Sequence, residues 1–342
     1  MLNTNGHKKY TAGGNIEAEK LLAQTLREIG ECLSGSGLSV YLGGSYGRGD
    51  GGVRQDTENG LLYNDLDFFV FSRQKVQGAE KLLHDIAKKY ESQLKVDVDF
   101  SRVMSIKDIK RNSRRLMMQE LKRGYRHICG EDLLEQYLPK YPAETLPFSE
   151  ACRLWLNRGM GLLLAKEQID KNTVNTDFVL RNINKAVLGS IDAYLIARNE
   201  YLWSLNERAE FIQKSDLPQD WKQLYQTAVE FKSSPHRQIT VSVNDLWEQV
   251  KNLYLATVQL ACQTENGENT EQAVFKKCRQ KKELSVINYI KFCIKSRKIH
   301  IFSKMLFMDP AAVVLCKSFN VLSGSHDFTI DGKLLKYWQI FN

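Results

Sequence analysis

The chain has 342 residues, of which 43% are hydrophobic and 10% aromatic. This apolar content excludes an intrinsically disordered protein, and the length favours two domains over one. No apolar run approaches the roughly 18–20 residues that cross a bilayer, so we expect no membrane contact. Lysine and arginine number 48 against 40 acidic residues, and the resulting formal charge of +8 favours polyanionic partners.

Cysteine usage and the N-terminal residues bear on the cellular compartment. The seven cysteines are scattered singly without a C-x-x-C pair, which argues against a disulfide framework or a zinc site. The opening residues, MLNTNGHKKY, contain no apolar stretch of the kind found in secretory signals. We therefore expect a reduced, cytoplasmic protein.

Residues 1–145 predict a small α/β domain. A loose lead-in of about a dozen residues comes first. Apolar residues at helical spacing then predict a helix over 16–33, which the glycines of the segment SGSG end. The further predicted elements are strands at 38–42, 63–71 and 94–100 and helices at 78–90 and 106–125.

Residues 146–342 predict a mainly helical domain with bundle-like antiparallel packing. The whole chain is therefore expected to be α+β, with a small mixed sheet in the first domain. A polar loop is expected at 263–272, and a hairpin around Asp331-Gly332 in the tail 328–341. The predicted helices are 148–166, 176–198, 206–213, 221–231, 241–262 and a basic helix or helix pair over 273–307.

A glycine-rich turn follows the first predicted strand. Glycines and their backbone N–H groups at such a turn can hold phosphate. The segment GRGDGG matches G-x-G-x-x-G formally, but a strand instead of a helix follows it, so a dinucleotide fingerprint is rejected. The absence of G-K-[ST], H-R-D and D-F-G motifs also argues against a Walker P-loop and a protein kinase.

Two acidic pairs lie in the second and third predicted strands. Asp65 and Asp67 are separated by one residue, as are Asp97 and Asp99, so each pair projects to one side of its strand. Carboxylates gathered on a sheet face repel one another and are costly to desolvate. A divalent cation offsets that cost, and Mg²⁺ suits hard oxygen ligands. With the glycine turn, the sequence predicts a site for a metal-bound nucleoside triphosphate.

Together these motifs resemble the nucleotidyltransferase superfamily typified by DNA polymerase β, which includes kanamycin nucleotidyltransferase, poly(A) polymerases and oligoadenylate synthases. Its pattern is an apolar residue, Gly, then Gly or Ser, then D-h-D in a strand, and a further acidic residue in another strand. The resemblance covers residues 16–135. The matching segments here are LGGS at 42–45, GSYGRG at 44–49, DLD at 65–67 and VDVDF at 96–100.

The resemblance implies roles for the four acids. Asp65 and Asp67 would ligate one or two Mg²⁺ ions, or Mn²⁺, beside the triphosphate. Asp97 or Asp99 would complete the second metal site and help to deprotonate the attacking hydroxyl. Both project to the same side of the strand, and the flanking V-D-V-D pattern favours Asp97 as the metal ligand.

The resemblance also assigns the nucleotide to the glycine turn. The backbone of Gly44 and the side chain of Ser45, next to Gly43, would hold the β- and γ-phosphates. Arg48 is either a phosphate contact or a turn residue with a salt bridge, and Tyr46 is expected to pack in the core. The implied reaction is attack of a hydroxyl on the α-phosphate of a nucleoside triphosphate, ATP first, with release of pyrophosphate.

The acceptor is left open between a small molecule, a protein and an RNA 3′ end. A template-independent oligonucleotide synthase and an inactive nucleotide- or RNA-binding member of the same fold are the alternatives.

The polar segment 50–62 makes the glycine-to-aspartate spacing longer than is usual in the family, and it is predicted to form a mobile flap. Basic residues at 107–126 and 276–304 are either polyanion contacts or solvated helix faces. The segment GYRHICG at 124–130 is similar to a helix end of antibiotic-type transferases.

Overall fold

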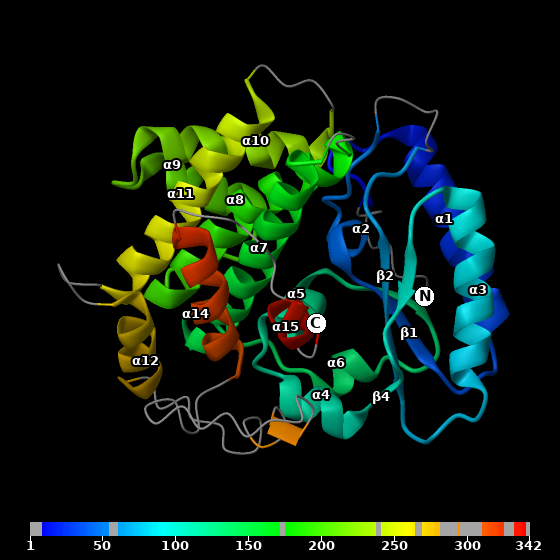
Figure 1. Cartoon of the computed structure of the whole chain (residues 1–342). Coiled ribbons are helices and arrows are strands. Elements are labelled where there is room, and N and C mark those ends of the chain that lie inside the picture. The colour runs from blue at the N-terminus through cyan, green and yellow to red at the C-terminus, as the bar shows by residue number, and fades with distance from the viewer. Residues whose placement is uncertain are drawn as a thin grey trace. The chain divides into compact units, whose positions relative to one another are not determined.

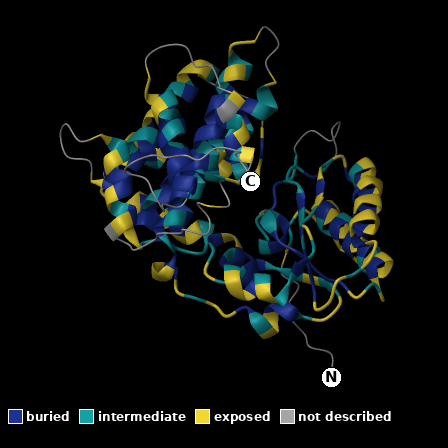
Figure 2. Ribbon diagram, turned by 60° about the horizontal axis from the view of Figure 1, so that its bottom comes forward, coloured by how far each residue is buried: buried dark blue, intermediate teal, exposed yellow. Residues whose placement is uncertain are grey.

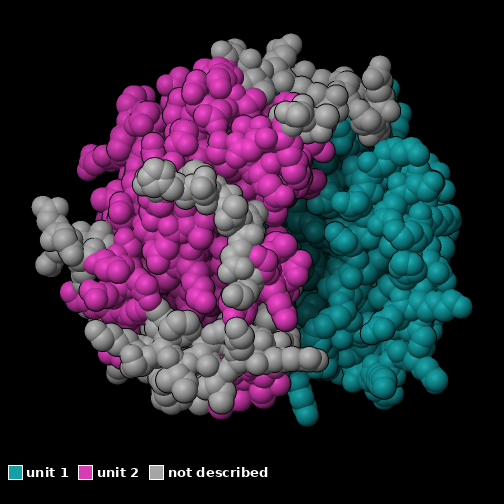
Figure 3. Space-filling view, in the orientation of Figure 1, with its two compact units in different colours: residues 1–141, 230–236 teal, residues 142–229, 237–342 magenta. Residues whose placement is uncertain are grey.

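The computed structural model is mixed α/β, mostly helical with a small mixed sheet (Figure 1). The chain divides into two compact units, the first of residues 1–141 and 230–236 and the second of residues 142–229 and 237–342 (Figure 3). The structure describes residues 9–54, 61–171, 175–236, 241–263, 269–280, 290, 293–294, 310–324 and 332–339.

The first unit is built on a five-stranded sheet of order β3-β2-β1-β5, with β4 also paired to β2. β1 runs antiparallel to both β2 and β5, whereas β2 runs parallel to β3 and β4. The strands are β1 (Ser39–Leu42), β2 (Leu66–Ser72), β3 (Val98–Phe100), β4 (Met104–Ser105) and β5 (Arg126–Cys129). The helices are α1 (Ile16–Leu33), α2 (Gly44–Arg48), α3 (Ala79–Leu94), α4 (Ile106–Asn112), α5 (Leu116–Gly124) and α6 (Leu133–Tyr137).

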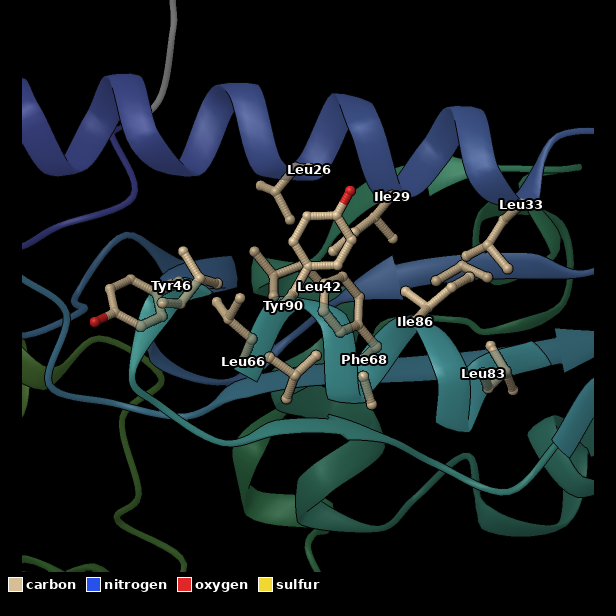
Figure 4. Close-up of a cluster of buried hydrophobic side chains, with 14 of the residues drawn as sticks. Leu26, Ile29, Leu33, Leu42, Tyr46, Leu66, Phe68, Leu83, Ile86 and Tyr90 are labelled. Carbon is tan, nitrogen blue, oxygen red and sulfur yellow. The ribbon is translucent and has the colours of Figure 1, made fainter. Parts of the chain in front are cut away.

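Helices cover both faces of this sheet. α1 and α3 lie on one face, where their apolar side chains meet those of β1 and β2 (Figures 1 and 4). Phe68 of β2 is at the centre of this layer and stacks on Phe100 of β3, with ring centroids 4.7 Å apart. The opposite face carries Tyr41 and Phe71, which pack against α4, α5 and α6. Burial on both faces explains why β1 and β2 are apolar along most of their length.

Several predicted elements of the first unit are corrected. The lead-in is packed from Lys9 onward, because Thr11 is buried and pairs with Gly51, and the Glu19 carboxylate accepts from its backbone N–H at 2.8 Å. The predicted helix over 106–125 is two helices. Arg115 has an extended backbone, so α5 starts anew after it. The segment 124–130 begins where α5 ends, at Gly124, and continues as strand β5, whose N–H and C=O groups pair with β1.

The second unit is helical in its described part. α7, α8, α11 and α14 pack together, and their buried residues lie on the faces that the helices turn toward one another (Figure 2). The buried indoles are fixed by hydrogen bonds: Trp155 donates to Thr257 at 3.2 Å and Trp247 to the Leu162 carbonyl at 2.8 Å. The helices are α7 (Phe148–Ile169), α8 (Thr176–Arg198), α9 (Leu205–Lys214), α10 (Gln219–Ser233), α11 (Val243–Cys262), α12 (Thr270–Gln280), α14 (Pro310–Ser323) and α15 (Gly332–Gln339), preceded by a short 3₁₀ turn over Ala143–Thr145.

The C-terminal predictions fare less well than the central ones. The expected hairpin in the tail is wrong, because the residues after Asp331 form helix α15. α14, the most apolar helix of the unit, was not anticipated. Residues 264–268, half of the predicted loop over 263–272, lie outside the described residues, and residues 270–272 belong to α12. Most of the basic segment 276–304 also lies outside the described residues. No helix in the described part of the chain has the length and apolar content needed to cross a membrane.

Candidate functional site

The pairing of β2 with β3 brings the two acidic pairs together. The parallel register sets Asp67 directly opposite Asp99, with Leu66 opposite Val98 and Phe68 opposite Phe100. Side chains at paired positions of neighbouring strands point to the same face, so the two carboxylates are neighbours. The apolar partners fill the other face, beneath α1 and α3.

The first members of the two pairs lie just before their strands. Asp65 precedes β2 and Asp97 precedes β3, and the backbone N–H of Leu66 donates to the Asp97 carbonyl at 2.9 Å. The register thus continues one step back from the strands, and all four acids gather at one end of the sheet. The side chains of Asp65 and Asp67 are half-buried, whereas Asp97 and Asp99 are exposed.

The register favours Asp99 over Asp97 as the acid that acts with Asp67, against the preference drawn from the V-D-V-D pattern. The pKa of the Asp99 carboxyl is raised, first by partial burial and then by the negative charges of Asp65, Asp97 and Glu91. The neighbouring negative charges oppose ionisation of Asp99, and a bound cation would offset this repulsion. The register that separates the two residues is absent from the sequence, where both project to the same side of the strand.

The glycine turn lies against Asp67. β1 ends at Leu42, and the backbone N–H of Gly43 then donates to the Asp67 carbonyl at 2.8 Å. Gly44 has φ +59°, and a Cβ at this position would overlap the Asp67 carboxylate oxygen Oδ2. Only glycine allows both this left-handed backbone and this close approach. Ser45, half-buried in the first turn of α2, is therefore placed beside the acids.

Arg48 is engaged in ion pairs at the end of α2. Its guanidinium lies 3.6 Å from the Asp50 carboxylate and 3.5 Å from that of Glu120. This geometry supports the turn-residue alternative for Arg48 over a phosphate contact. Asp50 also accepts from Lys232 Nζ at 2.5 Å. Lys232 is in the last turn of α10, within the first unit. Because it is far from Asp50 along the chain, local sequence patterns could not predict this contact.

The basic segment 107–126 separates into structural and exposed residues. Lys122 is buried, and its ammonium donates to the Leu134 carbonyl at 2.9 Å and to Glu135 at 2.6 Å. Arg123 and Arg126 likewise donate to backbone carbonyls, those of Tyr141 and Lys9. The cationic surface that remains is smaller than predicted. Its exposed members are Lys107, Lys110, Arg111 and Arg114.

The segment 50–62 has an ordered stem. Val53 pairs with Leu62, and the Arg54 backbone N–H donates to the Leu61 carbonyl at 2.9 Å. Leu62 is fully buried in the core beneath α1 and α3, so the stem is part of the fold. Residues 50–54 and 61–62 of the predicted flap therefore belong to this stem, and only its tip, residues 55–60, lies outside the described residues.

The donor chemistry of the acidic end of the sheet fits Mg²⁺ or Mn²⁺. Oxygen ligands are abundant there, and Asp99 is surrounded by like charge. Among the described residues, no group of three or more His, Cys, Asp or Glu side chains is disposed to hold a metal ion. The fit therefore rests on Asp67 and Asp99, the two neighbouring carboxylates, with Asp65 next to them.

Comparisons with known proteins add no relative. No protein-family model matches the chain, and no curated protein sequence or solved structure matches it.

Proposed function

We propose that this chain is a metal-dependent nucleotidyltransferase, which transfers a nucleoside monophosphate from a nucleoside triphosphate to a hydroxyl. One observation carries the proposal: Asp67 and Asp99 are paired in register on parallel strands, while Gly44 lies against the Asp67 carboxylate. The phosphate-holding turn and the acids therefore adjoin, as the resemblance to the DNA polymerase β superfamily requires.

Each residue has a distinct part in the proposed reaction. Asp65 and Asp67 would hold the divalent cation, with Asp99 as the third acid. The bound cation would supply neutralisation of the triphosphate charge. Ser45 and the backbone of Gly44 orient the β- and γ-phosphates. The acceptor oxygen bonds to the α-phosphorus, the bond from that phosphorus to the oxygen bridging to the β-phosphate breaks, and pyrophosphate leaves. Asp99 receives the hydroxyl proton.

The direct test is incubation with each α-labelled nucleoside triphosphate and Mg²⁺, with and without cell extract, followed by identification of any labelled product. Asp67→Asn should abolish labelling while retaining the fold. Asp85→Asn is the matched control, because Asp85 is exposed on α3 and outside the acidic cluster. Labelling by Asp67→Asn at the level of the parent would refute the assignment of the acids.

The exposed basic residues of α4 and the turn after it favour an RNA acceptor over a small molecule. Lys107, Arg111 and Arg114 offer several contacts to a phosphate backbone. Affinity that depends on several such contacts falls steeply with salt concentration. Transfer that declines strongly between low and moderate salt supports RNA, and transfer indifferent to salt supports a small hydroxyl compound.

A further inference from the structure

Tyr46 occupies a special place in the glycine turn. It follows Ser45 directly in α2, and its ring is fully buried at one end of the core cluster. Its hydroxyl points away from the aliphatic side chains of that cluster (Figure 4). A burial of this kind accounts for Tyr46 as a packing residue, as the sequence predicted, but not for the direction of its hydroxyl.

The Tyr46 hydroxyl uses its full hydrogen-bonding capacity on backbone groups. It donates to the Gly52 carbonyl at 2.8 Å and accepts from the N–H groups of Tyr63 at 3.1 Å and Asn64 at 3.2 Å. A phenolic hydroxyl has one hydrogen to donate and accepts through its lone pairs. The Asn64 side chain completes the ring of contacts by accepting from the Gly52 N–H at 2.7 Å.

These contacts lie on both sides of the tip 55–60. Gly52 precedes the tip, whereas Tyr63 and Asn64 follow it and lead directly into Asp65. The hydroxyl therefore ties the two ends of the stem to α2, which begins at the glycine turn. Burial raises the pKa of Tyr46 to about 12, so the hydroxyl keeps its hydrogen throughout the physiological range.

We infer that Tyr46 is a positioning residue, whose hydroxyl fixes Asp65 relative to Ser45. The inference rests on the proposed function, because it gives Asp65 and Ser45 the roles of metal ligand and phosphate contact.

Tyr41 provides a matched control from the same unit. Its ring is also fully buried, and its hydroxyl donates to the Glu131 carbonyl at 2.9 Å and accepts from the Leu133 N–H at 2.7 Å. These partners begin α6, and none of them adjoins the acids. Tyr46→Phe and Tyr41→Phe thus remove equivalent hydroxyls, and only the first alters the support of Asp65.

The experiment compares both variants with the parent by three readouts. Amide hydrogen exchange at Asn64 reports the hydrogen bonds of the Tyr46 hydroxyl. The Tyr63 N–H is less suitable, because it has a second acceptor in the Gly52 carbonyl at 3.3 Å. Affinity for Mn²⁺ in the presence of ATP reports the metal site without turnover. The rate of nucleotidyl transfer at saturating nucleotide reports the chemistry.

Tyr46→Phe should accelerate Asn64 exchange and lower Mn²⁺ affinity and the transfer rate by about 10- to 100-fold, whereas Tyr41→Phe changes neither affinity nor rate by more than a few-fold. Unchanged Asn64 exchange, or equal effects of the two variants on Mn²⁺ affinity, would overturn the inference. If the parent protein binds Mn²⁺ but transfers no nucleotide, the proposed reaction is refuted. The positioning role of Tyr46 is then judged from Asn64 exchange and Mn²⁺ affinity. A parent that binds no Mn²⁺ overturns both.

Discussion

The contact between Gly44 and Asp67 gives the sharpest test of the site. Replacing Gly44 by alanine adds a single methyl group, which would overlap Asp67 Oδ2 and approach its Cγ to 2.9 Å. The carboxylate ends a short side chain, so it can rotate away without disturbing the strand. Rotation, however, removes it from the position beside Ser45 and Asp99 where the proposal places the metal.

Stability and activity should therefore respond differently. An alanine at φ +59° costs about 1–2 kcal/mol relative to glycine, and rotation of Asp67 adds little. Gly35→Ala is the matched control, because Gly35 has φ +73° and no atom lies within 4 Å of its added Cβ. Both variants should lose about the same free energy of unfolding. Only Gly44→Ala should lose activity, by about 100-fold, as expected for a misplacement of about 1 Å.

Urea denaturation of both variants gives the change in free energy of unfolding, and Mg²⁺-dependent labelling gives the transfer rate. The reasoning is refuted if the two variants transfer nucleotide equally well. It is also refuted if Gly44→Ala loses activity only in proportion to its unfolded fraction, since the methyl group would then act through stability alone.

Three further predictions concern charge and burial. Asp99 has a raised pKa from burial and neighbouring negative charge, so the metal-free protein loses stability as pH rises through that pKa. Asp99→Asn should therefore stabilise the protein at neutral pH in chelator, while reducing the transfer rate by about 100-fold or more. Melting curves from about pH 4 to 8 in which the variant gains no stability over the parent as pH rises would contradict this. Lys122→Met leaves the buried Leu134 carbonyl without its donor and should cost about 1–3 kcal/mol in urea denaturation, whereas Lys107→Met at an exposed position should stay within about 0.5 kcal/mol. Burial raises the pKa of the Cys152 thiol, so alkylation of the native protein should label exposed Cys32 and spare Cys152 until denaturant is added, and equal labelling by mass spectrometry would show the burial to be wrong.

Periodicity determined the long helices from sequence. The bounds predicted for α1 and α8 agree with the structure, because apolar residues at helical spacing follow an N-cap asparagine in each case, Asn15 and Asn175. Both signals are local, so no tertiary information was needed. The apolar run of α14 carried no such periodic contrast, and its burial on most sides explains why the pattern was uninformative.

Local sequence patterns did not predict the smaller elements correctly. β5 has four residues, including Arg126 and His127, and no alternation marks it as a strand. It exists because β1 offers it a pairing edge. The tail after Asp331 had a turn dipeptide that favoured a hairpin, yet its apolar residues suit the helix that forms.

The sequence by itself predicted that a glycine turn follows one strand and that two acidic pairs lie in the next two strands along the chain, because alternation and turn chemistry are properties of neighbouring residues. Only the tertiary structure decided that Asp99 stands opposite Asp67, since register depends on how β2 and β3 align across the intervening residues 73–97. It alone also showed that the Tyr46 hydroxyl binds backbone groups just before Asp65, because these groups come from both sides of the tip 55–60. Packing determines which residues lie next to one another, and it brings together residues that are far apart in the sequence.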